Sequence, residues 1–80
     1  MKCNILLFGI AADIVGSNEL TLDIAENSTV NSLKSTLIDT YSGFKNVHQF
    51  AIAVNESYAN DETMIQANDI VAIIPPVSGG

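Results

Sequence analysis

Basic residues are scarce in this chain. Its 80 residues include nine acidic side chains but only three lysines and no arginine, which gives a net charge of −6. Nucleic-acid-binding proteins need clustered Lys and Arg side chains to contact phosphates, whereas Lys2, Lys34 and Lys45 are far apart in this sequence. We therefore expect no nucleic-acid partner, and we expect any partner protein to present a basic surface.

Cysteine and histidine occur once each, as Cys3 and His48. A lone cysteine cannot close an internal disulfide, and any metal site would depend mostly on carboxylates. We therefore predict no bound metal, and we expect Cys3 to be a packed thiol in a strand rather than a nucleophile. The glycines also lack the spacing of a phosphate-binding loop. These absences predict that the chain has no self-contained active site.

Long hydrophobic runs are absent as well, because no apolar stretch approaches the roughly 20 residues of a membrane-spanning helix. The short apolar run over residues 5–12 follows Lys2, as the apolar core of a signal peptide would, but the positive charge is single and Asp13 ends the run. Cleavage after this run would also remove the strongest predicted strand. The sequence thus predicts a cytoplasmic protein without a membrane segment.

Hydrophobic residues make up 48% of the chain, which is enough for the core of one small domain. Alternating apolar residues predict a strand over residues 3–8 and a second strand over residues 20–24. In the first strand, Cys3, Ile5 and Leu7 share one face. The turn-forming residues 16–18 between the two strands indicate a hairpin.

A helix is predicted over residues 30–41. Its apolar residues recur at helical spacing and form one stripe: Val30, Leu33, Leu37, Ile38 and Tyr41. Ser28 or Thr29 is suited to cap the first turn, because a hydroxyl oxygen can accept from a backbone N–H that lacks a partner. Gly43 is suited to the left-handed position that often follows a helix.

Three more strands are predicted, over residues 50–54, 58–59 and 70–74, with turns at residues 55–57 and 67–69. Between the second and third of these strands, Met64 and Ile65 are expected to fill the core.

The resulting order is strand, strand, helix, strand, short strand, strand. It predicts an α+β fold of the β-grasp (ubiquitin-like) type, in which a mixed sheet of four to five strands packs on one main helix. We expect the β-grasp domain to span residues 1–76. A flexible C-terminal Gly-Gly tail then spans residues 77–80.

The last six residues are Pro75, Pro76, Val77, Ser78, Gly79 and Gly80. Two adjacent glycines add nothing to a core, and without Cβ atoms their backbone can pass through a narrow channel. The prolines stiffen the segment, so less entropy is lost when it inserts into a partner. This pattern predicts that the Gly80 carboxylate is itself the reacting group. The alternative is that these residues are a frayed terminus or a vector-derived remnant.

Residues 71–80 resemble the ending of the small, sulfur-carrying subunits of molybdopterin synthase, which finish in a hydrophobic-Pro-Pro-Val-Ser/Thr-Gly-Gly string. The resemblance continues through Leu-Phe followed by Val-Gly within residues 5–16, through Thr29-Val30 at the helix start, and through residues 53–55. Asn68-Asp69 departs from the usual Gly-Asp of the family, but asparagine tolerates the left-handed backbone conformation.

The resemblance implies a mechanism in which a partner similar to ubiquitin activators uses ATP to convert the Gly80 carboxylate into an acyl-adenylate. A sulfur donor then replaces AMP and leaves a thiocarboxylate on Gly80. No cofactor is expected to be bound tightly. The tail formed by Pro75, Pro76, Val77, Ser78 and Gly79 would enter the large catalytic subunit of molybdopterin synthase. There the sulfur would be transferred to cyclic pyranopterin monophosphate, and the dithiolene of molybdopterin would form. A heterotetramer of two small and two large subunits is also implied.

The same resemblance implies that Phe8, Tyr58 and Ile74 contact the partner enzymes. Side chains alternate along a strand, so Phe8 and Ile74 point to the opposite face of the sheet from the residues that precede them. An exposed apolar cluster on that face would be an interaction site. The alternative is that these three side chains pack inside the protein.

Other functions are compatible with a β-grasp domain that ends in Gly-Gly. The sulfur carrier of thiamine biosynthesis shares these features but usually lacks the Pro-Pro-Val string. A lysine-conjugated modifier or a carrier for tRNA thiolation would use the same chemistry. A non-catalytic ubiquitin-like interaction module is a different class. One added C-terminal residue would leave such a module functional, whereas it would abolish the activity of a carrier.

Overall fold

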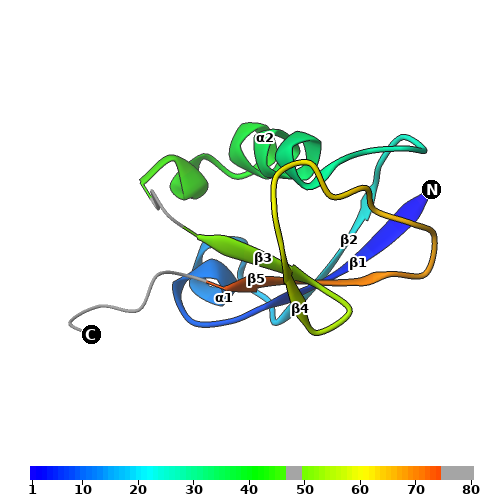
Figure 1. Cartoon of the computed structure of the whole chain (residues 1–80). Coiled ribbons are helices and arrows are strands. Elements are labelled where there is room, and N and C mark those ends of the chain that lie inside the picture. The colour runs from blue at the N-terminus through cyan, green and yellow to red at the C-terminus, as the bar shows by residue number, and fades with distance from the viewer. Residues whose placement is uncertain (47–49, 75–80) are drawn as a thin grey trace.

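The computed structural model describes residues 1–46 and 50–74. The elements in chain order are β1 (Lys2–Leu7), α1 (Ile10–Val15), β2 (Glu19–Asp23), α2 (Val30–Thr40), the 3-10 helix η1 (Ser42–Asn46), β3 (Ala51–Val54), β4 (Ser57–Ala59) and β5 (Ile70–Ile74). The strands form one sheet in the order β2-β1-β5-β3-β4, and α2 crosses one of its faces (Figure 1). The predicted α+β fold, a mixed sheet on one main helix, is confirmed.

Strand β5 occupies the centre of the sheet. It pairs in parallel with β1, where Leu7 is opposite Ile73, and in antiparallel with β3, where Ala51 is opposite Ile74. The hairpin of β1 and β2 and the hairpin of β3 and β4 therefore lie on opposite sides of β5.

The core lies between the sheet and α2. Cys3, Ile5 and Leu7 are buried on the side of β1 that was predicted to face inward. They pack with the buried stripe of α2 and with inward residues of the central strands: Val30, Leu33, Leu37, Ile52, Val71 and Ile73. Burial of each such large side chain contributes about 1.5–3 kcal/mol, so this layer supplies most of the driving force for folding.

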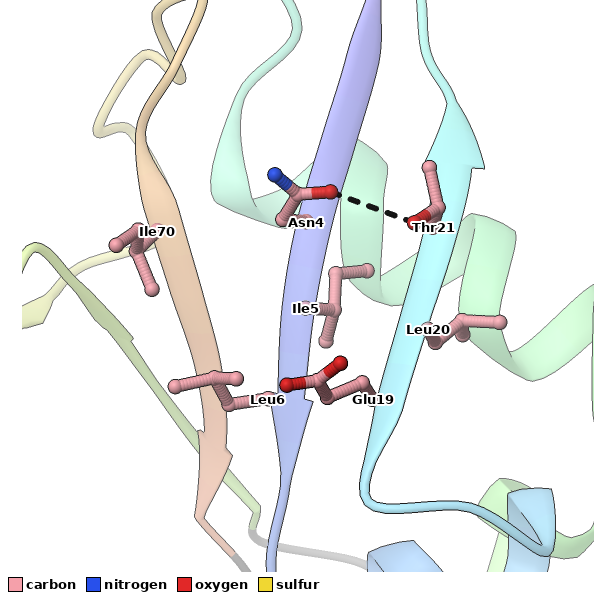
Figure 2. A pocket seen from close by; sticks show the side chains of 7 residues that line it. All are labelled: Asn4, Ile5, Leu6, Glu19, Leu20, Thr21 and Ile70. Carbon is pink, nitrogen blue, oxygen red and sulfur yellow. Dashed lines mark hydrogen bonds between the residues drawn. The ribbon is translucent and has the colours of Figure 1, made fainter.

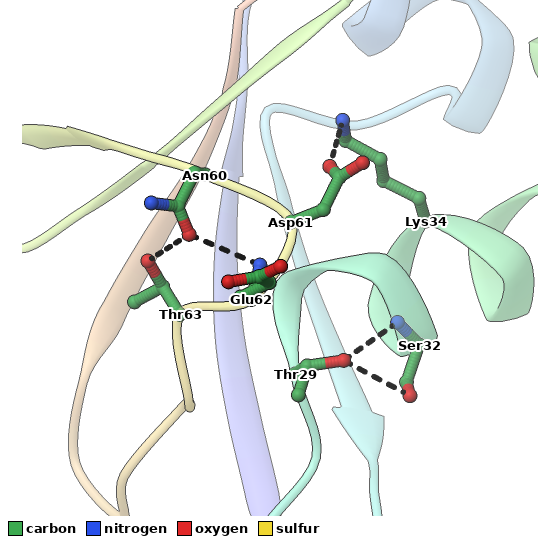
Figure 3. Close-up of polar contacts among 7 residues, drawn as sticks. All are labelled: Thr29, Ser32, Lys34, Asn60, Asp61, Glu62 and Thr63. Carbon is green, nitrogen blue, oxygen red and sulfur yellow. Dashed lines mark hydrogen bonds and ion pairs between the residues drawn. The ribbon is translucent and has the colours of Figure 1, made fainter.

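The start of α2 is held by its cap and by the loop that precedes β5. The Thr29 hydroxyl oxygen accepts a hydrogen bond from the Ser32 backbone N–H at 3.2 Å, which confirms one of the two predicted caps. The Val30 N–H donates to the Thr63 carbonyl at 2.9 Å, so another backbone donor of the first turn is satisfied. Figure 3 shows the same loop joined to the helix by an ion pair between Lys34 and Asp61 at 2.7 Å.

Two local predictions are wrong. The helix ends at Thr40, the next residue Tyr41 is extended, and Gly43 lies inside η1 rather than in a left-handed position. A Cβ atom on Gly43 would come within 2.9 Å of Ile14 Cγ2, so glycine is suited here because η1 approaches α1 closely. Met64 is 45% exposed whereas Ile65 is buried, because neighbouring residues of an extended segment point in opposite directions.

The predicted turns are present and depend on left-handed residues. Asn55 and Glu56 both have positive φ, 51° and 71°, and join β3 to β4 in a two-residue hairpin of the kind that matches strand twist. Asn68 has φ of 70°, a left-handed conformation that asparagine tolerates better than most residues. Residues 10–15, an apolar stretch of mixed character in the sequence, form the short helix α1, which buries Ala11.

Candidate functional site

The end of β5 is the part of the described structure nearest in sequence to the predicted tail. Ile73 is paired with Leu7 on one side and with Ile52 on the other, and Ile74 is paired with Ala51. The chain is therefore held on both sides of β5 up to Ile73, and on the β3 side at Ile74. The predicted tail residues Pro75, Pro76, Val77, Ser78, Gly79 and Gly80 lie outside the described residues, and so does His48.

One face of the sheet is not covered by α2 (Figure 1). A row of side chains crosses this open face, because residues opposite one another in neighbouring strands point to the same side. Register places Leu6 opposite Ala72, Ala72 opposite Ala53, and Ala53 opposite Tyr58. The open face thus presents an apolar row that runs from β1 to β4.

The predicted partner-contacting residues differ in exposure. Phe8 is 52% exposed and directly follows β1, and Tyr58 is 76% exposed on β4, so neither packs inside the protein. Ile74 is half-buried at the end of β5. Their contact with a partner stays a prediction, but two of the three side chains are accessible for it.

Ile70 is an exposed apolar residue that the sequence reading missed. It lies at the start of β5 and is 51% exposed. Strand parity could have found it, because Ile70, Ala72 and Ile74 alternate with the buried Val71 and Ile73.

A shallow groove follows β1 on the open face, between β2 and β5. Its sides include Ile70 and Thr21, and Asn4, Leu6 and Glu19 line it along β1 and β2 (Figure 2). The Thr21 hydroxyl donates a hydrogen bond to Asn4 Oδ1 at 3.3 Å across the strand pair. Sequence reasoning could not identify this groove, because its walls come from strands far apart in the chain.

The charged residues near this groove differ in whether they form an ion pair. Lys2 and Asp23 are opposite one another in β1 and β2 and form an exposed ion pair at 3.8 Å. Lys34 belongs to the helical layer, where it contacts Asp61. Among the residues that the structure describes, Glu19 has no ion-pair partner. The groove is therefore negative at its β2 side.

Cys3 is buried in the core, as predicted. Desolvation raises the pKa of its thiol above the ordinary value, and the negative charge of Asp69 raises that pKa further. Since the thiolate is the nucleophilic form, this thiol is poorly suited to react. Within residues 1–46 and 50–74, no three His, Cys, Asp or Glu side chains gather in a way that could hold a metal ion. The helices of the same region are too short or too polar to cross a membrane.

Comparison with known proteins gives consistent matches over nearly the whole chain. Residues 5–80 match the model of the ThiS family. The chain is 33% identical to the molybdopterin synthase sulfur carrier subunit of Arabidopsis thaliana, over 100% of this chain and 84% of the relative.

Solved structures establish the similarity of fold. Small archaeal modifier protein 1 of Haloferax volcanii superposes with a TM-score of 0.83 at 21% identity, covering 95% of this chain and 98% of that chain. A chain from the complex of subunits 1 and 2 of the molybdopterin-converting factor of Helicobacter pylori superposes with a TM-score of 0.68 at 22% identity, covering 100% of both.

Proposed function

The chain belongs to the ThiS family, and we propose that it is the sulfur carrier subunit of a molybdopterin synthase. The observation that carries the proposal is the 33% identity, over all of this chain, to a relative with that name. The ending Pro-Pro-Val-Ser-Gly-Gly at residues 75–80 supports the same assignment.

The proposed reacting group is the carboxylate of Gly80. A carboxylate is a poor electrophile until an adenylating enzyme uses ATP to convert it into an acyl-adenylate. A sulfur donor then displaces AMP, and the resulting thiocarboxylate is a good nucleophile toward cyclic pyranopterin monophosphate. The buried Cys3 supports this assignment indirectly, because its raised pKa disfavours a thiolate that could carry the sulfur instead.

Delivery of the sulfur is proposed to depend on residues 75–79, which would enter the active site of the large subunit. The pairing of β5 on both sides supports this role, because a tail that leaves a fixed strand loses less orientational freedom when it inserts. The activated carrier is proposed to act in a heterotetramer of two small and two large subunits.

Partner contacts are proposed for Phe8, Tyr58 and Ile74. The exposure of Phe8 and Tyr58 supports this role. The Helicobacter pylori structure is named as a complex of two subunits of the molybdopterin-converting factor, which supports a large subunit as one partner. An adenylating enzyme similar to ubiquitin activators is the second proposed partner. The proposal includes a cytoplasmic location, since the single charge of Lys2 and the interruption at Asp13 argue against a signal peptide.

The test is the intact mass of the chain after incubation with its adenylating enzyme, ATP and a sulfur donor. The expected product is heavier by the difference between sulfur and oxygen, and fragmentation should locate the change on Gly80. Addition of the large subunit and cyclic pyranopterin monophosphate should then return the carrier to its original mass as molybdopterin forms.

The matched control carries one extra alanine after Gly80, and it should remain folded but gain no sulfur. If the unextended chain keeps its mass with its own adenylating enzyme, the carrier function is excluded and an interaction module remains. If sulfur leaves the chain only when a thiazole synthase replaces the large subunit, the chain acts in thiamine synthesis instead.

A further inference from the structure

The groove on the open face combines an apolar lining with an unpaired carboxylate. Leu6 is half-buried in it and Ile70 forms its β5 side with half of its surface exposed. Glu19 lies opposite Leu6 in the strand register, and Figure 2 shows its side chain reaching over β1 toward Leu6. The aliphatic side chains of Leu6 and Ile70 and the carboxylate of Glu19 thus line the same groove.

The described residues do not use all of the hydrogen-bonding groups in this groove. The Asn4 side-chain oxygen accepts from the Thr21 hydroxyl, whereas Figure 2 shows its amide nitrogen on the side away from Thr21. The nearest lysine on these two strands, Lys2, is already paired with Asp23. Within the described part of the chain, Glu19 is therefore left as a hydrogen-bond acceptor for a group from outside.

We propose that this groove binds an arginine side chain of the large subunit, an inference that rests on the proposed function. The arginine stem packs along Leu6 and Ile70, and its guanidinium donates to the Glu19 carboxylate. Long basic side chains commonly bury their methylene groups while the charged head contacts a polar partner. Arginine suits this position better than lysine, because a planar guanidinium binds a carboxylate through two parallel hydrogen bonds.

The position of the groove and the charge of the chain support this occupant. The groove joins the apolar row at Leu6, so one partner surface can cover both it and Tyr58. With a net charge of −6, the chain repels anionic ligands and attracts basic surfaces. A second copy of the chain would bring further acidic residues toward Glu19, which disfavours self-association here.

The experiment compares Glu19→Gln with Asp39→Asn. Both variants remove one negative charge without a change of shape, but Asp39 is exposed on α2, in the layer on the other side of the sheet. Binding to the purified large subunit is measured by calorimetry at low and at physiological salt. Glu19→Gln is expected to weaken binding about tenfold or more and to reduce the salt dependence, since a paired charge at an interface is lost. Asp39→Asn is expected to bind as the unaltered chain does.

Ile70→Ser provides a second, independent variant. It should weaken binding severalfold while it leaves the salt dependence unchanged, because it removes apolar contact but no charge. Thermal unfolding of each variant verifies that the domain is intact. Equal affinities for the unaltered chain and Glu19→Gln would overturn the proposal, as would equal losses for Glu19→Gln and Asp39→Asn.

The mass of Gly80 separates failure of this inference from failure of the proposed function. If Glu19→Gln gains sulfur and binds the large subunit normally, the groove is not an arginine site but the carrier function stands. If the unaltered chain never gains sulfur, both fail. If sedimentation shows a dimer that Glu19→Gln dissociates, while affinity for the large subunit is unchanged, the occupant is a second copy and the proposal is wrong.

Discussion

The two faces of the sheet share the same strands but carry different side chains. On the face covered by α2, Ile5, Val71 and Ile73 are fully buried. On the open face, the equally apolar Ile70 and the aromatic ring of Tyr58 remain largely exposed. Apolar surface that stays in contact with water contributes little to folding. The open face therefore holds exposed apolar groups that are available to the proposed partner.

The largest expected effect comes from one substitution made on both faces of β5. Ile73→Ala should lower the free energy of unfolding by about 2–5 kcal/mol, because it opens a cavity in the core. Ile70→Ala removes the same atoms from the open face and should cost about 1 kcal/mol or less. Urea unfolding measures both values. Equal losses would mean that the open face also stabilises the fold.

Tyr58→Ala should separate stability from binding. Exposed aromatic residues at interfaces often contribute about 2 kcal/mol or more to affinity. Because Tyr58 is 76% exposed in the chain alone, the free energy of unfolding should change by about 0.5 kcal/mol or less. Calorimetric titration with the large subunit and urea unfolding provide the two numbers. A large loss of stability without loss of affinity would contradict a docking role for the open face.

Glu56→Gly tests the hairpin that presents Tyr58. Glu56 has φ of 71°, a conformation that glycine adopts without strain and that is unfavourable for a residue with a Cβ atom. We expect the substitution to raise the free energy of unfolding by about 0.5–1 kcal/mol, measured in urea. Glu62→Gly is a control, because Glu62 is exposed and does not have positive φ. It should not stabilise the chain.

The smallest effect concerns the thiol of the covered face. Burial and Asp69 raise the pKa of Cys3 above 9.0, so the unfolded chain ionises at lower pH than the folded chain. Stability linked to this thiol is then fully present below about pH 9 and is lost as the pH rises toward the folded pKa. Unfolding measured between pH 8 and about pH 10.5 should show this decline, and Cys3→Ala should show less of it. Identical slopes for both chains would contradict a raised pKa.

The buried residues of the covered face could be predicted from the sequence, because buried positions there recur with the spacing of a strand or a helix. Alternation placed Cys3, Ile5 and Leu7 on one inward face, and the hydroxyls before the helix narrowed the cap to Ser28 or Thr29, of which the structure uses Thr29. The turn at Asn68 followed from the tolerance of asparagine for positive φ.

The features that the sequence did not predict depend on contacts between segments far apart in the chain. The role of Gly43 is set by its approach to Ile14, which no local pattern encodes. The groove requires β2 and β5 on either side of β1, so Glu19 and Ile70 become neighbours only through the order of strands. The exposure of Met64 reflects which side of an extended segment meets the core.

The central position of β5 also has a consequence for synthesis. All residues of the other four strands precede β5 in the chain, yet only β5 joins their two hairpins into one sheet. A nascent chain that stops before residue 70 therefore exposes two unpaired strand edges rather than a nearly finished domain. The sheet can therefore be completed only at about the time when the segment that follows β5 is synthesised.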